Sequence, residues 1–336
     1  MTGEMAQETL LGALEQLSVE VGVPLDELRR TVEEALTAAY RRAFETSGEV
    51  SVRLQPETGE MIATERTLGP DGAAAERQLP VDEFKRMAAQ TARTAVMKHL
   101  RELERSRALS ELERHRGELA TGPVDRIERG TVFVDLGKVE GWMPPEEQIP
   151  GEELRPGRPV TVVLLEPASS PRQARGVKVS RASRSFVLRL LDAEVPEIAA
   201  GTVEVRAITR EPGLRTKVAV ASNDPAVDPV GACVGPRGVR HRSLLQELGR
   251  EHVDIVPWDE EPSRFVAFAL GPATVVDVEI ETDTRTAHVQ VPRDQLSLAI
   301  GKDGQNARLA ARLTGWRIDI AAADGETAGG GPDSVE

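Results

Sequence analysis

Two glycine-rich loops hold the residues of this sequence whose types and spacing could do chemistry. Their residues are Gly235, Pro236, Arg237 and Gly238 in the first loop, and Gly301, Lys302, Asp303 and Gly304 in the second. Glycine allows a positive φ and lets another backbone approach closely. The N–H groups that open a following helix can then face phosphate. This spacing predicts contact with the sugar-phosphate backbone of a nucleic acid.

The surroundings of the two loops repeat along the chain. Each loop follows a short apolar run and precedes a helix-like segment, and a strand candidate comes next, at Val253–Ile255 and at Ile318–Ile320. A strand upstream is repeated as well, at Arg215–Val220 and at Arg285–Val291. A repeat of this kind indicates two copies of one small domain. Two unrelated glycine turns are the weaker interpretation.

A Gly-x-x-Gly turn between two helices, inside the order helix-strand-strand-helix-helix-strand, resembles the KH domain. We therefore expect two tandem KH (type II) α/β domains, at residues 182–258 and 259–321. The tail that follows, residues 322–336, is rich in glycine, alanine and acidic residues, and we expect it to be disordered.

The net charge of −13 is unusual for a protein that binds nucleic acid. Most of the acidic excess lies toward the two ends of the chain, and the first repeat is nearly neutral. The local field, and not the total charge, governs phosphate binding. The first loop is locally basic, whereas Lys302 and Arg308 of the second stand against Asp303. The overall acidity argues against tight, indiscriminate binding to duplex DNA.

Residues 113–181 are punctuated by glycine and proline and contain five short strand candidates. These candidates are Glu118–Val124, Gly130–Leu136, Val139–Met143, Val160–Glu166 and Gly176–Ser180. Five strands of this length predict a small S1/OB-type β-barrel.

One aromatic residue of this barrel could face outward. Alternation places Val132 and Val134 on the core face and Phe133 on the other face. An exposed phenylalanine on such a sheet is a stacking platform for bases. The alternative, that a neighbouring domain covers Phe133, stays open.

Residues 1–112 predict an N-terminal α+β head. Its expected elements are a helix that starts near residue 5, a helix from Pro24 to Phe44, a hairpin of Val50–Leu54 and Met61–Leu68, and a long helix from Val81 to about Leu112. The loop Gly69–Glu76 is rich in glycine and alanine, and we expect it to lack rigid structure. The fold class is therefore multidomain α+β.

The sequence offers no catalytic or metal site. Its five histidines are scattered without metal-ligand spacing, and its one cysteine, Cys233, is expected to be a buried thiol. It contains neither a P-loop nor a nucleophile elbow. No leader opens the chain, and no apolar run approaches membrane-spanning length. We expect a cytoplasmic, non-enzymatic protein without cofactors.

The order of head, S1-like barrel and two KH units resembles the NusA family of bacterial transcription elongation factors. The segments that carry the resemblance are Glu8–Glu15, Val139–Glu152, Glu194–Ile198, Arg210–Lys217 and Asp228–Gly238. It covers the chain from about residue 8 to residue 320 and is most specific in the last two of these segments.

This resemblance implies that residues 1–112 dock on the RNA polymerase core near the RNA exit channel, while the barrel and the KH units hold nascent single-stranded RNA. A monomer of this kind modulates pausing, intrinsic termination and antitermination, with other antitermination factors as further partners. The resemblance and the loop charges together give these candidate RNA contacts: Gly235, Pro236, Arg237, Gly238, Arg240, Gly301, Lys302, Asp303, Gly304, Gln305, Arg308 and Phe133.

Two departures from the family pattern affect the expectation. Pro144 stands where many S1 domains carry a histidine, so that face of the barrel should bind RNA weakly. The acidic C-terminal repeats of some members are missing, so the regulation that they provide should be absent. The alternative function is that of an S1/KH RNA-binding protein in RNA decay or on the ribosome, without polymerase docking. Docking of residues 1–112 on RNA polymerase would discriminate between the elongation factor and this alternative.

Overall fold

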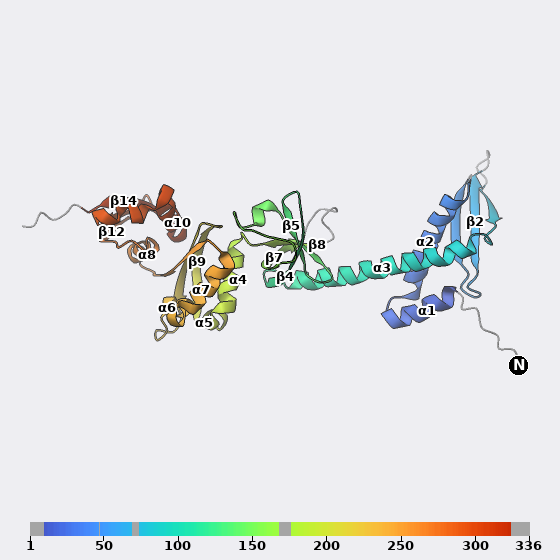
Figure 1. Ribbon diagram of the computed structural model, residues 1–336, viewed down its shortest axis with the longest axis horizontal. Helices are drawn as coiled ribbons and strands as arrows, with labels where there is room; N and C mark the ends of the chain where they lie inside the picture. The colour runs from blue at the N-terminus through green and yellow to red at the C-terminus, as the bar shows by residue number, and fades with distance from the viewer. Residues whose placement is uncertain (1–9, 47, 69–73, 168–175, 324–336) are drawn as a thin grey trace, which may run out of the picture. The chain divides into compact units, whose positions relative to one another are not determined.

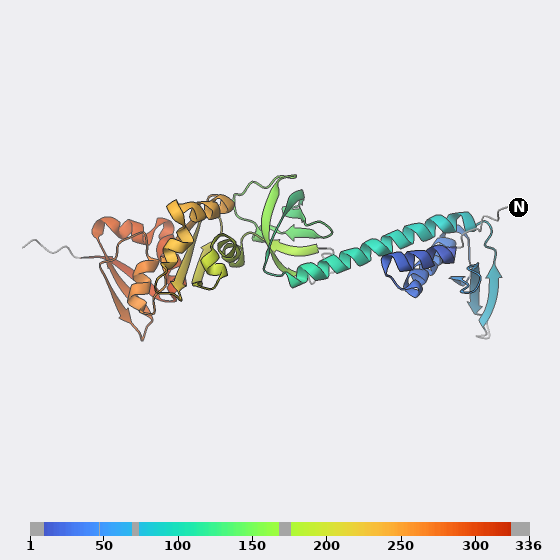
Figure 2. The same cartoon turned by 90° about the horizontal axis from the view of Figure 1, so that it is seen from below.

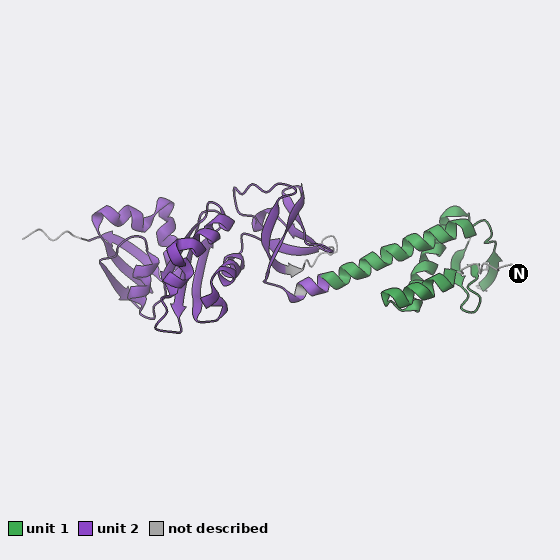
Figure 3. Cartoon of the chain, turned by 60° about the horizontal axis from the view of Figure 1, so that its bottom comes forward, with its two compact units in different colours: residues 1–108 green, residues 109–336 purple. Residues whose placement is uncertain are grey.

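The computed structural model describes residues 10–46, 48–68, 74–167 and 176–323. The chain divides into two compact units, residues 1–108 and residues 109–336 (Figure 3). The multidomain α+β class predicted from the sequence is confirmed, with an α+β head in the first unit and a barrel followed by two KH units in the second (Figure 1).

The first unit packs helices against a three-stranded antiparallel sheet of order β1-β2-β3. Its elements are α1 (Leu10–Val21), α2 (Leu25–Ala43), β1 (Glu49–Leu54), β2 (Met61–Leu68), β3 (Ala74–Leu79) and α3 (Lys85–Arg114), whose last residues belong to the second unit. The hairpin, the helix after Pro24 and the long helix predicted from their hydrophobic periods are all present. The first residues of the predicted opening helix, before Leu10, lie outside the described residues.

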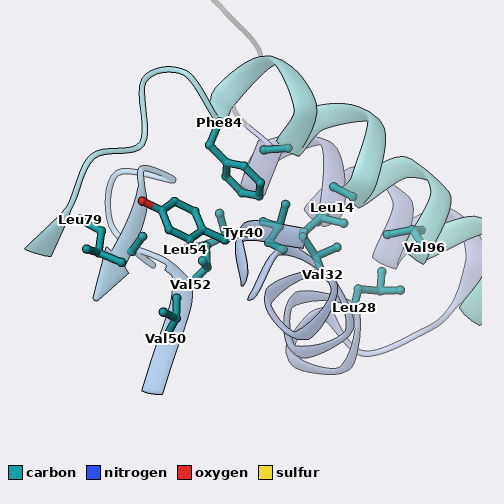
Figure 4. Close-up of a cluster of buried hydrophobic side chains, with 14 of the residues drawn as sticks. Leu14, Leu28, Val32, Tyr40, Val50, Val52, Leu54, Leu79, Phe84 and Val96 are labelled. Atoms are coloured by element: carbon teal, nitrogen blue, oxygen red, sulfur yellow. The ribbon is translucent and has the colours of Figure 1, made fainter. Parts of the chain in front are cut away.

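Buried hydrophobic side chains of α1, α2, α3 and the three-stranded sheet form the core of this unit. Helix α2 contributes Leu28, Val32, Leu36 and Tyr40 to this core, and β1 contributes Val50, Val52 and Leu54 (Figure 4). The Tyr40 hydroxyl donates to the Pro80 carbonyl at 2.9 Å, and its ring meets Phe84 edge to face at 5.1 Å. Because the hydroxyl has an acceptor, the whole ring is buried without an unsatisfied polar group.

Strand β3 corrects one expectation from the sequence. Residues 74–76, part of the loop expected to lack rigid structure, pair with β2, where Ala74 lies opposite Leu68. All residues of β3 except Leu79 are exposed. The strand is therefore held by backbone hydrogen bonds at the edge of a sheet, and no hydrophobic alternation marks it. The rest of the predicted loop, residues 69–73, lies outside the described residues.

The second unit begins with a closed barrel of order β4-β5-β6-β8-β7. Its strands are β4 (Leu119–Glu128), β5 (Thr131–Asp135), β6 (Glu140–Met143), β7 (Pro159–Pro167) and β8 (Gly176–Ser180). All five predicted strands are present, and the S1/OB-type barrel is confirmed. Val132 and Val134 face the barrel core, as the alternation predicted.

Two KH units of the same type II topology follow (Figure 2). The first contains α4 (Arg184–Glu194), α5 (Pro196–Ala199), β9 (Val203–Glu211), β10 (Arg215–Ser222), α6 (Pro229–Val234), α7 (Val239–Leu248) and β11 (His252–Pro257). The second contains α8 (Pro262–Ala269), β12 (Asp277–Glu281), β13 (Thr286–Val291), α9 (Leu296–Ile300), α10 (Gln305–Thr314) and β14 (Arg317–Ala322). In each sheet the central strand pairs antiparallel with the strand before it and parallel with the strand after the loop. The tail from residue 324 lies outside the described residues, while Ala322, which we expected to belong to it, is in β14.

The two KH units share a buried interface in which apolar residues of both form one cluster. Thr209 Oγ1 in β9 donates to the Leu309 carbonyl in α10 at 3.3 Å. The ammonium of Lys217, a side chain with no exposed surface, donates to the Gly271 carbonyl and to Asp254 Oδ2, each at 2.9 Å. A buried charge is tolerated only when its hydrogen bonds are satisfied. The second KH unit therefore supplies an acceptor that Lys217 of the first KH unit needs.

The barrel is joined to the first KH unit through Arg181. Its side chain is buried and donates to both carboxylate oxygens of Glu152, to the Thr161 carbonyl, and to the carboxylate and the carbonyl of Glu247 in α7. Hydrogen bonds between ionised groups are shorter and stronger than neutral ones. One arginine thus holds together three segments of the second unit.

Candidate nucleic-acid interface

The two Gly-x-x-Gly loops have the same backbone conformation. The opening glycines have φ and ψ of 72° and 171° at Gly235 and of 76° and 171° at Gly301. The third residue is left-handed in both loops, with φ of 54° at Arg237 and 52° at Asp303. Both closing glycines have φ of 71°. Non-glycine residues rarely adopt this region, so its recurrence shows that the internal repeat extends to the geometry of the loops.

The opening glycine of each loop is required by space as well as by conformation. A Cβ on Gly235 would lie 2.7 Å from the Arg240 side chain, and a Cβ on Gly301 would lie 2.8 Å from the backbone nitrogen of Asn306. The closing glycine is different, because a Cβ on Gly304 would meet no atom within 4 Å. The outer side of the second loop is therefore open to another backbone.

The second residue of the helix after each loop fastens the loop to the helix before it. Arg240 in α7 donates to the Ala232 carbonyl at 2.6 Å and to Glu197 Oε2 at 2.8 Å. Asn306 in α10 is fully buried and donates to the Leu298 carbonyl at 3.4 Å, among other carbonyls. Arg240 was a candidate RNA contact, and the structure places its guanidinium, half-buried, among groups of its own domain.

The fourth residue of the same helix braces the loop from the other side. Arg242 Nη1 donates to the Arg237 carbonyl at 2.7 Å, and Arg308 Nη1 donates to the Asp303 carbonyl at 3.3 Å. In both loops the acceptor is the carbonyl of the left-handed residue. These bonds place a guanidinium group against each loop.

The remaining loop candidates divide into exposed and engaged side chains. Those of Pro236, Arg237, Lys302 and Asp303 are exposed. Within the described part of the chain, neither Arg237 nor Lys302 has a carboxylate within ion-pair distance. Gln305 and Arg308 are engaged instead with Glu211, at the end of β9 in the first KH unit.

Glu211 gathers three side chains of α10 on one carboxylate. Arg308 approaches with two nitrogens, Nε to Oε1 at 2.9 Å and Nη2 to Oε2 at 3.0 Å. Gln305 Nε2 donates to Oε2 at 2.9 Å, and Arg312 Nη1 lies 3.5 Å from Oε1. The hydrogen bonds from Arg308 hold the pKa of Glu211 below its usual value, against the opposing effect of burial. The carboxylate is therefore charged at neutral pH.

Phe133 in the barrel faces away from the core, as the alternation predicted, but it is only partly exposed. The guanidinium carbon of Arg126 lies 4.0 Å from the centre of its ring. Arg126 is held there by Asp125 and Glu128, each at 2.7 Å, and by Glu140. A residue of the same barrel, and not a neighbouring domain, therefore covers the predicted stacking platform.

Three residues that shape this surface escaped the sequence reasoning. Glu211 gives no local signal because its partners lie in another domain. Arg126 resembles any other charged residue of an exposed strand end. Asn306 could have been found, since it occupies a core position of the amphipathic helix α10 and a polar residue there needs hydrogen-bond partners.

Other classes of site are absent from the described residues. No described helix is both long and apolar enough to cross a membrane. No cluster of three or more histidine, cysteine or acidic side chains is placed to hold a metal in that part of the chain. Burial raises the pKa of the Cys233 thiol to about 11, which keeps it protonated and unreactive at neutral pH.

Three family models match this chain. The NusA N-terminal domain matches residues 9–69, the NusA-like first KH domain matches residues 181–258, and the NusA-like second KH domain matches residues 262–328.

Curated relatives match nearly the whole chain. The transcription termination/antitermination protein NusA of Bacillus subtilis (strain 168) is 40% identical, over 93% of this chain and 90% of its own length. The protein of the same name from Mycobacterium tuberculosis (strain H37Rv) is 40% identical, over 92% of each chain. Among solved structures, the N-terminal domain of NusA from B. subtilis is 30% identical and covers 29% of this chain and 96% of its own, with a TM-score of 0.25.

Proposed function

This chain belongs to the NusA family of transcription termination/antitermination proteins, and from that membership we propose that it binds RNA polymerase and nascent single-stranded RNA. In doing so it modulates pausing, intrinsic termination and antitermination. The observation that carries the RNA half of the proposal is the pair of loops with one backbone geometry, each presenting an exposed cation, Arg237 or Lys302.

The loops suit the backbone of a single strand for three reasons. Their closing glycines have positive φ, and the one at Gly304 leaves open space for a ligand backbone. The N–H groups at the start of α7 and α10 supply donors for phosphate. The exposed guanidinium of Arg242 also lies against the first loop. We propose that residues 113–181, 182–258 and 259–321 act together as the RNA-binding part of the chain.

The head offers a surface for the polymerase half of the proposal. A groove of about 580 Å³ lies between α2 and α3, lined by small and apolar side chains such as Ala39, Met87 and Ala95. Its two charged lining residues, Arg42 and Lys98, are both basic, although the chain as a whole carries −13. We propose that an apolar segment of RNA polymerase with acidic flanks occupies this groove.

Two methionines of α3 test the groove. Met87 lines it and is 42% exposed, while Met97 is 47% exposed and is not among the lining residues. Met87→Glu should abolish co-purification with core RNA polymerase, and Met97→Glu should leave it intact. Equal retention of polymerase by the two folded variants would argue against this docking surface.

The function itself is tested by the lifetime of a hairpin-stabilised pause with the cognate RNA polymerase. We expect the full chain to lengthen the pause and Met87→Glu to lose the effect. An unchanged pause lifetime with intact RNA binding would favour the alternative, an S1/KH RNA-binding protein that acts in RNA decay or on the ribosome.

We further propose that the protein works without catalysis or cofactor, as a monomer in the cytoplasm, with other antitermination factors as additional partners. The support is family membership, because the relatives are named for transcription termination and antitermination and for no chemical reaction.

A further inference from the structure

The two loops differ in charge although their backbones agree. At the first loop Arg237 and Arg242 are both exposed, and within the described residues neither has a carboxylate partner. Arg242 donates to a neutral carbonyl, so among the residues that the structure describes its charge stays uncompensated. Arg240 is paired with Glu197 and adds nothing. The first loop therefore presents two uncompensated guanidinium groups to a phosphate.

The second loop has as many cations nearby but fewer that are uncompensated. Arg308 and Arg312 are exposed, at 44% and 55%, and both pair with the one carboxylate of Glu211. That carboxylate is itself only 16% exposed, so solvent screens the pairing less than at an open surface. Asp303 in the loop adds a further negative charge. Lys302 is the cation of this loop that has no carboxylate partner in the described part of the chain.

Arg308 and Arg242 occupy the same place in the repeat, and each donates Nη1 to the carbonyl of its loop's left-handed residue. Position alone would make them equivalent phosphate ligands. The difference is the fork of Arg308 on Glu211, which makes two parallel charge-assisted hydrogen bonds. A phosphate must displace Glu211 to use Arg308, and needs to displace nothing of that charge to use Arg242.

We propose that Glu211 withholds Arg308 and Arg312 from phosphate, so that the salt-dependent part of RNA affinity comes chiefly from the first loop. The second loop then binds mainly through its backbone N–H groups and Lys302. This inference rests on the RNA binding proposed above. Glu211 then determines how the phosphate contacts to one RNA strand are divided between the two KH units.

The salt dependence of RNA affinity measures how many phosphate contacts the cations of each loop make. Each cation that engages a phosphate releases counterions, and log K for a single strand falls against log salt by about 0.7 per contact. Backbone N–H contacts leave this slope nearly unchanged. A labelled single-stranded RNA of random sequence, titrated with the full chain at several salt concentrations, gives the slope for each variant.

Glu211→Gln should tighten binding at low salt and steepen the slope by up to about 1.4, or about 0.7 for each arginine released. Glu204→Gln is the matched control, since Glu204 lies on the same strand and pairs with Arg206, so its replacement removes the same charge without releasing Arg308 or Arg312. A thermal melt of each variant checks that the interface of the KH units survives. Equal slopes for Glu211→Gln and Glu204→Gln would overturn the inference.

A second pair of variants compares the loops without touching Glu211. Arg237→Gln should lower the slope by about 0.7, while Arg308→Gln should leave it nearly unchanged. Equal losses for the two would show that Arg308 already engages phosphate and would overturn the inference while leaving RNA binding intact. Failure of the parent chain to bind the RNA would instead overturn the proposed function.

Discussion

Arg210 and Glu251 form a two-point ion pair from which solvent is excluded. Arg210 Nε and Nη2 each lie 2.9 Å from a different oxygen of Glu251, and the side chains are 1% and 0% exposed. Glu251 also accepts from the Thr216 hydroxyl and the Gly213 amide, and Arg210 donates to the Ser183 carbonyl. Arg210 and Thr216 belong to the segment on which the family resemblance is most specific, so this network explains why that segment has its composition.

Breaking this pair should be strongly destabilising. Glu251→Gln leaves the Arg210 guanidinium buried without its counter-charge, and we expect the loss of about 3–5 kcal/mol in the free energy of unfolding. Urea denaturation of the full chain measures the change, which is taken from the unfolding transition of residues 109–336. Glu204→Gln removes an exposed carboxylate of the same sheet and should cost less than about 1 kcal/mol. A loss below 1 kcal/mol for Glu251→Gln would contradict this account.

The opening glycines should differ in their tolerance of a side chain. A Cβ at Gly235 would press on the flexible Arg240 side chain, whereas at Gly301 it would press on the backbone of Asn306 at the start of α10. Both sites have nearly the same positive φ, so the conformational cost is shared. We therefore expect Gly301→Ala to lower the melting temperature clearly more than Gly235→Ala. An equal effect would show that conformation alone decides the cost.

The arginine over Phe133 should limit RNA stacking on the barrel. Arg126→Ala uncovers the ring, and since a stacked base contributes about 1–3 kcal/mol, we expect tighter binding of single-stranded RNA despite the loss of a positive charge. Fluorescence anisotropy with a labelled strand provides the measurement. Adding Phe133→Ala should remove the gain, and Arg155→Ala, at an exposed arginine of the same barrel, should show none. Weaker binding by Arg126→Ala would mean that Arg126 itself contacts the RNA.

Cys233 should resist alkylation in the folded protein. The side chain is 1% exposed, and burial raises its pKa to about 11 from the usual 9.0. The folded state therefore holds the proton more tightly, and the stability that this group contributes is complete below pH 9.0 and is lost as the pH rises toward 11. Mass spectrometry after iodoacetamide treatment should show label only in denaturant. Ala38→Cys, on the exposed face of α2, should label at once, and rapid native labelling of Cys233 would contradict its burial.

The fold could be predicted from the sequence wherever hydrophobic period and turn residues agreed. The stripe of α2, the alternation around Val132 and the paired loops all met that condition. Strand β3 did not, because an exposed edge strand has no buried face to leave a period of two in its sequence.

Only those site residues that are marked by their neighbours in the sequence could be predicted. The loop residues Arg237 and Lys302 are marked by their neighbours in the chain, and the structure leaves both exposed. The state of Arg308 depends on Glu211, and that of Phe133 depends on Arg126. Such pairings form only when the chain folds, so residue type and spacing do not reveal which cations are already neutralised.

The ammonium of Lys217 has a consequence for the order in which the protein acquires its structure on the ribosome. The chain through β11 is synthesised before Gly271, whose carbonyl accepts from this ammonium. Until then the first KH unit carries a charged group that lacks one of its acceptors and an apolar surface that lacks its cover. We therefore expect the first KH unit to complete its folding only after the second KH unit has been synthesised, and a chain that ends between the two to be more sensitive to proteolysis.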